Sequence, residues 1–165
     1  MGKSATFWID LKPFLGDTTV EVPDQSLEQM SDEERLRRKE VILYVEDNPT
    51  NVRVVTRALQ RSRPDTIVLS APTAIAGLEL ARIYQPDAIL LDIGLPDMSG
   101  YEVLAALRRQ EQVRDTPILG ISSDATPDDV EKGLRAGFQN YLTKPLKLEE
   151  FDNALNYALP KRRLN

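Results

Sequence analysis

The chain contains no cysteine and no histidine among its 165 residues. The lack of cysteine excludes disulfides, thiol chemistry and thiolate metal sites. The lack of histidine excludes catalysis by imidazole and metal sites built from it. No apolar run approaches the roughly 20 residues that a membrane span requires, and the start shows no signal-peptide pattern. We therefore expect a cytoplasmic location and no membrane contact.

The chain also has fewer basic residues than acidic ones. The 21 lysines and arginines are outnumbered by 26 acidic residues, which gives a net charge of −5. This balance argues against nucleic-acid binding by the bulk of the chain. Hydrophobic residues make up 41% of the sequence. Length and composition together predict one domain with a single well-buried core, plus appendages.

From residue 41 onward, short apolar runs alternate with longer helical stretches. Runs rich in leucine and β-branched residues, bounded by proline, asparagine and glycine, are typical of buried parallel strands. We expect strands at 41–46, 66–70, 87–91, 117–121 and 139–143. We expect the first helix to be capped by Asn48, with Pro49 in its first turn. We expect four further helices at 73–84, 100–109, 127–135 and 148–158. Five strands, each followed by a helix, predict an α/β fold with a five-stranded, doubly wound parallel sheet.

Five polar side chains stand at the ends of these apolar runs: Glu46, Asp47, Asp92, Ser122 and Lys144. In an open parallel sheet, ligands bind at the carboxyl ends of the strands. We therefore expect three carboxylates, one hydroxyl and one ammonium to converge on one edge. That set suits the binding of a phosphoryl group beside a divalent cation.

Each of these residues has an ordinary alternative. Glu46 and Asp47 could simply cap the helix that follows them. An isolated Asp92 would more often cap a turn, Ser122 fits common turn chemistry, and Lys144 would usually be a solvated surface lysine. The glycines and proline of the loop after Asp92 let its backbone approach a ligand, which favours an acyl-phosphate nucleophile.

Three carboxylates in one place repel one another unless a cation neutralises them. A site built only from oxygen ligands favours Mg²⁺.

The runs VEDNPTN, LLDIGLPDMSGYEV, PILGISSDA and GFQNYLTKPL resemble the receiver domain of two-component response regulators, over residues 40–160. The resemblance implies a flavodoxin-like (βα)5 fold and a phosphoryl group accepted from phosphohistidine. It also implies roles for individual residues: Glu46 and Asp47 as metal-binding acids, Asp92 as the phosphorylated residue and a metal ligand, the Gly94 carbonyl as a metal contact, Ser122 as the conserved hydroxyl, Lys144 as the invariant lysine, and Tyr141 as the switch aromatic. Without the resemblance, Tyr141 is a plain half-buried strand aromatic. Gly94 and Asp124 occupy positions that modulate the phosphate lifetime in the family.

The N-terminal run GKSATFWIDL resembles the last strand of the ATP-binding domain of sensor histidine kinases, although Ser4 replaces a glycine there. We therefore interpret residues 1–15 as a kinase remnant and residues 16–39 as a polar linker. This layout predicts the C-terminal receiver of a hybrid sensor histidine kinase.

The expected partners are a phosphohistidine donor, either the kinase core or a phosphotransfer domain, and a downstream phosphotransfer protein. We expect the chain to promote its own phosphorylation and dephosphorylation, and to be a monomer or weak dimer. Two alternatives remain open. One is a receiver-like module that binds partners without phosphorylation. The other is an aspartate-nucleophile phosphohydrolase, which would need a second aspartate where this chain has Gly94.

Overall fold

The computed structural model describes residues 39–159, and these form a five-stranded sheet with five helices. The expected α/β architecture is confirmed. The elements in chain order are β1 (Glu40–Val45), α2 (Pro49–Ser62), β2 (Thr66–Ala71), α3 (Ala74–Tyr84), β3 (Ala88–Asp92), α4 (Gly100–Arg109), β4 (Ile118–Ser122), α5 (Pro127–Ala136), β5 (Asn140–Thr143) and α6 (Leu148–Ala158). The expected remnant at 1–15 and almost all of the linker at 16–39 lie outside the described residues.

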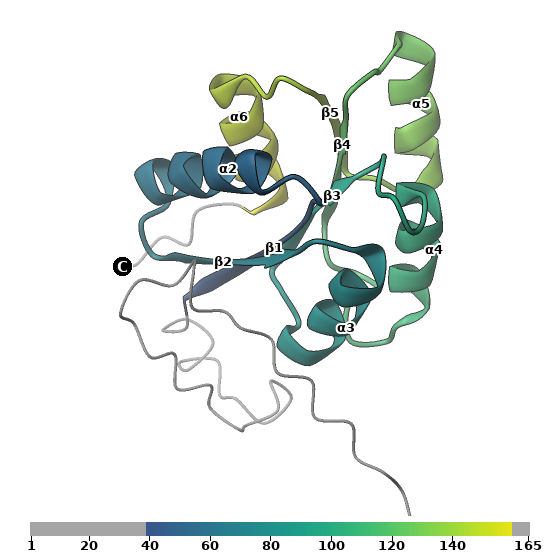
Figure 1. The fold of residues 1–165 in the computed structure, drawn as a ribbon, viewed down its shortest axis with the longest axis horizontal. Helices are drawn as coiled ribbons and strands as arrows, with labels where there is room; N and C mark the ends of the chain where they lie inside the picture. The colour runs from purple at the N-terminus through teal and green to yellow at the C-terminus, as the bar shows by residue number, and fades with distance from the viewer. Residues whose placement is uncertain (1–38, 160–165) are drawn as a thin grey trace, which may run out of the picture. The chain divides into compact units, whose positions relative to one another are not determined.

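All strand pairs are parallel, and the strand order is β2-β1-β3-β4-β5. Helices α2 and α6 cover one face of the sheet, and α3, α4 and α5 cover the other (Figure 1). Every residue of β3 and β4 is buried. Strands covered on both faces need apolar side chains on both sides, which is why these runs are apolar up to their last residues, Asp92 and Ser122.

Alternate residues of the central strands face two separate cores. Leu43 and Val45 of β1 pack with α3 and α4, whereas Ile42 and Tyr44 pack with α2 and α6. Successive side chains of a strand point to opposite faces, so the apolar run in β1 supplies both cores at once.

Side-chain caps fix where α2, α4 and α5 begin. Asn48 accepts a hydrogen bond from the Thr50 N–H at the start of α2, and Pro49 occupies the first turn as expected. Capping boxes at Ser99 and Thr126 start α4 and α5. The expected bounds differ from the observed ones by about one residue. The main difference is that Asp92 and Ser122 are the last residues of their strands.

No helix within residues 39–159 is long and apolar enough to cross a membrane.

Arg63 forms a buried clasp at the end of the sheet where β1 begins. Its guanidinium donates to both carboxylate oxygens of Glu40 at 2.8 Å, and also to the side chain of Asn156 and the carbonyl of Leu159. Only 8% of Arg63 is exposed. One planar side chain with several donors therefore joins the start of β1 to the end of α6.

We expect R63A to lower the free energy of unfolding by about 3 kcal/mol, because it leaves a largely buried carboxylate and a carbonyl without their partner. Denaturation by urea measures this change. The matched control is R82A, which removes an arginine from the exposed Arg82–Glu79 pair and should have a much smaller effect. Equal losses in the two variants would contradict a stabilising role for the clasp.

Candidate functional site

Three carboxylates meet at the carboxyl edge of the sheet. Glu46 and Asp47 follow β1, and Asp92 ends the neighbouring strand β3. One carboxylate oxygen from each residue lies within 4.8 Å of the others. Glu46 and Asp92 are only 2% and 5% exposed, whereas Asp47 is exposed. The cluster is therefore buried on one side and open to solvent on the other.

Lys144 brings a positive charge between two of these acids. Its ammonium nitrogen lies 2.7 Å from Glu46 Oε2 and 2.7 Å from Asp92 Oδ2. The Lys144 backbone N–H donates to the Ser122 carbonyl at 2.7 Å, which extends the pairing of β4 and β5 by one residue. This backbone bond fixes where the lysine leaves the sheet, so the side chain reaches across β4 to the carboxylates.

Glu46 is held by four donors. Oε2 accepts from Lys144 and from the Tyr44 hydroxyl, each at 2.7 Å. Oε1 accepts from the Asn51 side chain at 3.0 Å and from the Asn48 N–H at 3.2 Å. Two donors on each oxygen fill the usual acceptor capacity of a carboxylate.

These contacts determine the charge states in the cluster. Burial alone would raise the pKa of Glu46, but hydrogen bonds from Lys144, Tyr44 and Asn51 outweigh it, and the pKa lies below its usual value. Burial would lower the pKa of Lys144, but hydrogen bonds to Asp92 and Glu46 raise it instead. Burial and the hydrogen bond to Glu46 raise the pKa of Tyr44. At neutral pH, a charged lysine faces a charged Glu46.

Asp92 is also fixed by the loop that follows it. Its Oδ1 accepts from the Gly94 N–H at 3.0 Å, while its Oδ2 accepts from Lys144. Each oxygen therefore keeps acceptor capacity, in contrast to the oxygens of Glu46. The metal contact expected for the Gly94 carbonyl stays a prediction.

Ser122 ends the strand next to Asp92, but its hydroxyl is engaged within its own loop. Ser122 Oγ donates to the Asp124 carbonyl at 2.9 Å and accepts from the Asp124 N–H at 3.3 Å. A hydrogen bond from this hydroxyl to a group on Asp92 would first require the bond to the Asp124 carbonyl to break.

Tyr141 lies on the α5 side of β5 and is only 7% exposed. The ring is buried while the Ser122 hydroxyl is bonded to Asp124, and Gly133 and Gly120 leave room for it. The switch role expected for Tyr141 stays a prediction. A Cβ atom at Gly133 would collide with Tyr141 Cδ2. Phe138 packs edge-on against the same ring.

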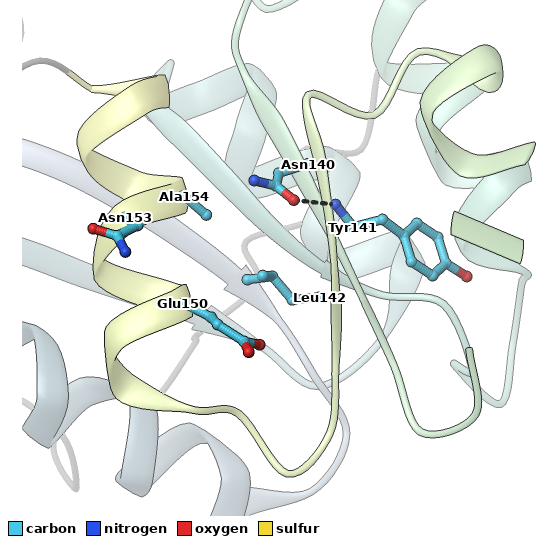
Figure 2. Close-up of a pocket in the computed structure, with 6 residues that line it drawn as sticks. All are labelled: Asn140, Tyr141, Leu142, Glu150, Asn153 and Ala154. Carbon is cyan, nitrogen blue, oxygen red and sulfur yellow. Dashed lines mark hydrogen bonds between the residues drawn. The ribbon is translucent and has the colours of Figure 1, made fainter. Parts of the chain in front are cut away.

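A groove runs between β5 and α6, away from the acidic cluster. It is lined by Asn140, Tyr141, Leu142, Glu150, Asn153 and Ala154. Figure 2 shows the Tyr141 ring pointing away from α6, on the opposite side of β5 from Leu142. None of the five polar residues predicted from the strand ends lines this groove.

Sequence reasoning missed three supporting residues. Tyr44 and Asn51 hold Glu46, and the signal for Tyr44 was a hydroxyl inside an otherwise aliphatic run, since a buried tyrosine needs a hydrogen-bond partner. Asp97, in the loop after Asp92, accepts from the backbone N–H groups of Ala74 and Ile75 at 3.0 and 3.3 Å. It therefore caps α3 and ties this loop to that helix.

Comparison with known proteins points to one family. Residues 42–156 match the family described as the response regulator receiver domain. The polar-differentiation response regulator DivK of Brucella ovis is 33% identical over 110 residues, which cover 67% of this chain and 88% of DivK.

Two solved structures share the fold closely. The chemotaxis response regulator CheY4 of Vibrio cholerae is 28% identical with a TM-score of 0.67, and the match covers 73% of this chain and 99% of CheY4. The receiver domain of sensor histidine kinase PA1611 from Pseudomonas aeruginosa PAO1 is 35% identical with a TM-score of 0.66, covering 74% and 99%. That domain was crystallised with a magnesium ion coordinated in its active-site cleft.

We expect G133A to lower the free energy of unfolding by about 1–2 kcal/mol, because the added methyl group collides with the Tyr141 ring. In a Y141A background the same change should instead stabilise the protein by up to about 1 kcal/mol, since alanine is the better helix former. Urea denaturation of the four proteins in this cycle measures both effects. The same sign in both backgrounds would refute the packing explanation.

The Asp97 cap should make stability depend on pH in a defined direction. Hydrogen bonds, first from the Ala74 N–H, lower the pKa of Asp97 below 3.8. Its contribution is therefore complete above about pH 4 and is lost as pH falls through the lower folded-state pKa. We expect D97N to be less stable than wild type by about 0.5 kcal/mol at pH 7, since solvent screens this exposed cap.

The difference between wild type and D97N should shrink as the pH falls below about 4 in matched denaturation curves. The other carboxylates titrate in both proteins and cancel. A difference that stays constant with pH would show that the charge of Asp97 does not matter.

Proposed function

Because this chain belongs to the response regulator receiver domain family, we propose that it accepts a phosphoryl group on Asp92 from a phosphohistidine and passes that signal on. The observation that supports this most directly is the position of Lys144, 2.7 Å from both Asp92 and Glu46. A lysine so placed neutralises the acceptor carboxylate and lies where phosphoryl oxygens would arrive.

The residues present fit a magnesium ion. All three candidate ligands are carboxylates, which Mg²⁺ prefers. Asp47 accepts no hydrogen bond from the described residues, and Asp92 keeps free acceptor capacity, so we propose these two as the direct carboxylate ligands, with the Gly94 carbonyl as a further contact. Glu46 is already saturated by four donors and would act through a bound water. The ion would supply charge neutralisation for the phosphoryl oxygens.

In the proposed step, a carboxylate oxygen of Asp92 attacks phosphorus in line with the leaving imidazole nitrogen. The new P–O bond forms as the P–N bond breaks, and the donor histidine, which carries a proton on its other ring nitrogen, leaves as neutral imidazole. Lys144 stays near enough to pair with the phosphoryl oxygens and holds Asp92 in position before the attack.

The phosphorylated state would then be communicated through Ser122. Its hydroxyl leaves the Asp124 carbonyl and donates to a phosphoryl oxygen, which pulls the loop after β4 toward Asp92. Tyr141 already fills its pocket, so we propose that this movement stabilises the buried ring and the face formed by α5 and β5.

We further propose a hybrid sensor kinase as the origin of this receiver. Two observations support this: the resemblance of the run GKSATFWIDL to a kinase strand, and the 35% identity to a receiver domain from a sensor histidine kinase. The donor would then be the kinase core or a phosphotransfer domain, with a second phosphotransfer protein downstream. We place the reaction in the cytoplasm, where ATP is available to phosphorylate the donor. Translation of the reading frame upstream of Met1 tests this origin.

The test of the central proposal uses acetyl phosphate and Mg²⁺ as a small-molecule donor system. We expect wild type to gain the mass of one phosphoryl group, D92N to gain none, and K144A to react about a hundredfold more slowly. Intact-protein mass spectrometry over a time course measures all three.

Leaving out Mg²⁺ should also suppress labelling of the wild type. Equal labelling of D92N and wild type would overturn the assignment. Continuous release of inorganic phosphate from simple phosphate esters would favour the phosphohydrolase instead.

A further inference from the structure

Tyr44 brings a hydroxyl to the acidic cluster from the interior of the domain. Its ring is fully buried in the core formed with α2 and α6, and its neighbours across the sheet are Ser70 of β2 and Leu90 of β3. A buried tyrosine hydroxyl needs a partner, and this one donates to Glu46 Oε2 at 2.7 Å. Because close packing fixes the ring, this donor stays in place when other side chains of the cluster move.

The two oxygens of Glu46 depend on different donors. Oε1 accepts from the Asn51 side chain and the Asn48 N–H, which both lie at the start of α2. Oε2 accepts from Tyr44 and Lys144, and within residues 39–159 it has no other donor. Of these four donors, Lys144 alone also contacts Asp92. The state of Asp92 therefore bears on Oε2 and not on Oε1.

The ammonium group of Lys144 is held less firmly than the Tyr44 hydroxyl. The Lys144 backbone is fixed by its bond to the Ser122 carbonyl, but the side chain is a flexible stem and is 16% exposed. Its nitrogen lies 2.7 Å from both Glu46 and Asp92. A phosphoryl group on Asp92 adds negative charge on one side of the lysine only. The ammonium group is then drawn toward the phosphoryl oxygens and away from Glu46.

That movement would leave Glu46 Oε2 without a donor if the Tyr44 hydroxyl were missing. Glu46 is only 2% exposed, so water cannot readily replace the lysine. A buried charged oxygen without a partner is unfavourable, and this favours the state in which Lys144 stays at Glu46. With the hydroxyl present, Oε2 keeps one short hydrogen bond and Lys144 is free to leave.

We propose that Tyr44 is a positioning residue for phosphoryl transfer to Asp92: its hydroxyl holds Glu46 Oε2 while Lys144 moves from that oxygen to the phosphoryl group. This inference rests on the proposed function, and it gives a residue of the core a part in the reaction. Tyr44 exchanges no atom or proton. With acetyl phosphate as the donor, the P–O bond to Asp92 forms as the P–O bond to the leaving acetate breaks.

The test is a double-mutant cycle on the rate at which acetyl phosphate labels the full chain in the presence of Mg²⁺. Y44F removes the hydroxyl and keeps the ring that fills the core. We expect Y44F to be labelled about tenfold more slowly than wild type, because Glu46 then retains Lys144. In a K144A background the same change should alter the rate by less than about twofold, since no lysine has to be released.

The matched control is N51A, which removes a donor from the other oxygen of the same carboxylate. Lys144 does not bond to Glu46 Oε1, so N51A should change the rate by the same factor in the wild-type and K144A backgrounds. A residue that only stabilises the fold would also act equally in both backgrounds. Urea denaturation of every variant checks that it is folded under the conditions of the assay.

A second measurement uses the wild-type chain alone. Beryllium fluoride with Mg²⁺ is an analogue of the phosphoryl group on a carboxylate, and a crystal structure of this complex reports where the lysine lies. We expect the Tyr44 hydroxyl to remain within hydrogen-bonding distance of Glu46 Oε2, and the Lys144 nitrogen to lie more than about 3.5 Å from that oxygen.

Any of four results would overturn the proposal. These are a Y44F rate equal to that of wild type, an equal slowing by Y44F in both backgrounds, an N51A effect that depends on Lys144 as strongly as the Y44F effect does, and a beryllium fluoride complex in which Lys144 still bonds to Glu46 Oε2. Failure of the proposed function is distinct from all four, since wild type would then gain no phosphoryl group from acetyl phosphate.

Discussion

The ammonium group of Lys144 between two buried carboxylates is the interaction on which the site depends. Glu46 and Asp92 are both nearly inaccessible to solvent, and two buried negative charges at the same edge of the sheet need a cation close by. Lys144 meets this need at 2.7 Å from each acid. Its own position is set by a backbone hydrogen bond to Ser122, so the electrostatics of the site follow from the register of β4 and β5.

The two cores explain how such a site can be stable. Alternation along β1 commits Leu43 and Val45 to one core and Ile42 and Tyr44 to the other, which fixes the strand on both sides. Tyr44 belongs to a core through its ring and to the site through its hydroxyl, which bonds Glu46. Packing of the Tyr44 ring in the core therefore holds its hydroxyl in place and orients the Glu46 carboxylate.

The polar residues at the carboxyl edge of the sheet could be predicted from the sequence, because each of them ends an apolar run and parallel strands bring such ends together. Side-chain direction was harder to predict. The Ser122 hydroxyl turns to the Asp124 backbone, a local choice that competes with any contact across the sheet. The pocket for Tyr141 depends on Gly133, which precedes it by eight residues and meets it only after α5 packs on β5. The hydrophobic periodicity of the sequence does not predict this contact between Gly133 and Tyr141.

The Arg63 clasp has a consequence for how this domain can be built into larger proteins. Because one guanidinium holds Glu40 and the Leu159 carbonyl, the chain enters and leaves the folded unit at the same place. That place is the end of the sheet opposite the acidic cluster, since β1 begins there and finishes just before Glu46. Neighbouring segments can therefore be attached, lengthened or exchanged at a single anchoring point while the reactive edge stays accessible to a visiting molecule.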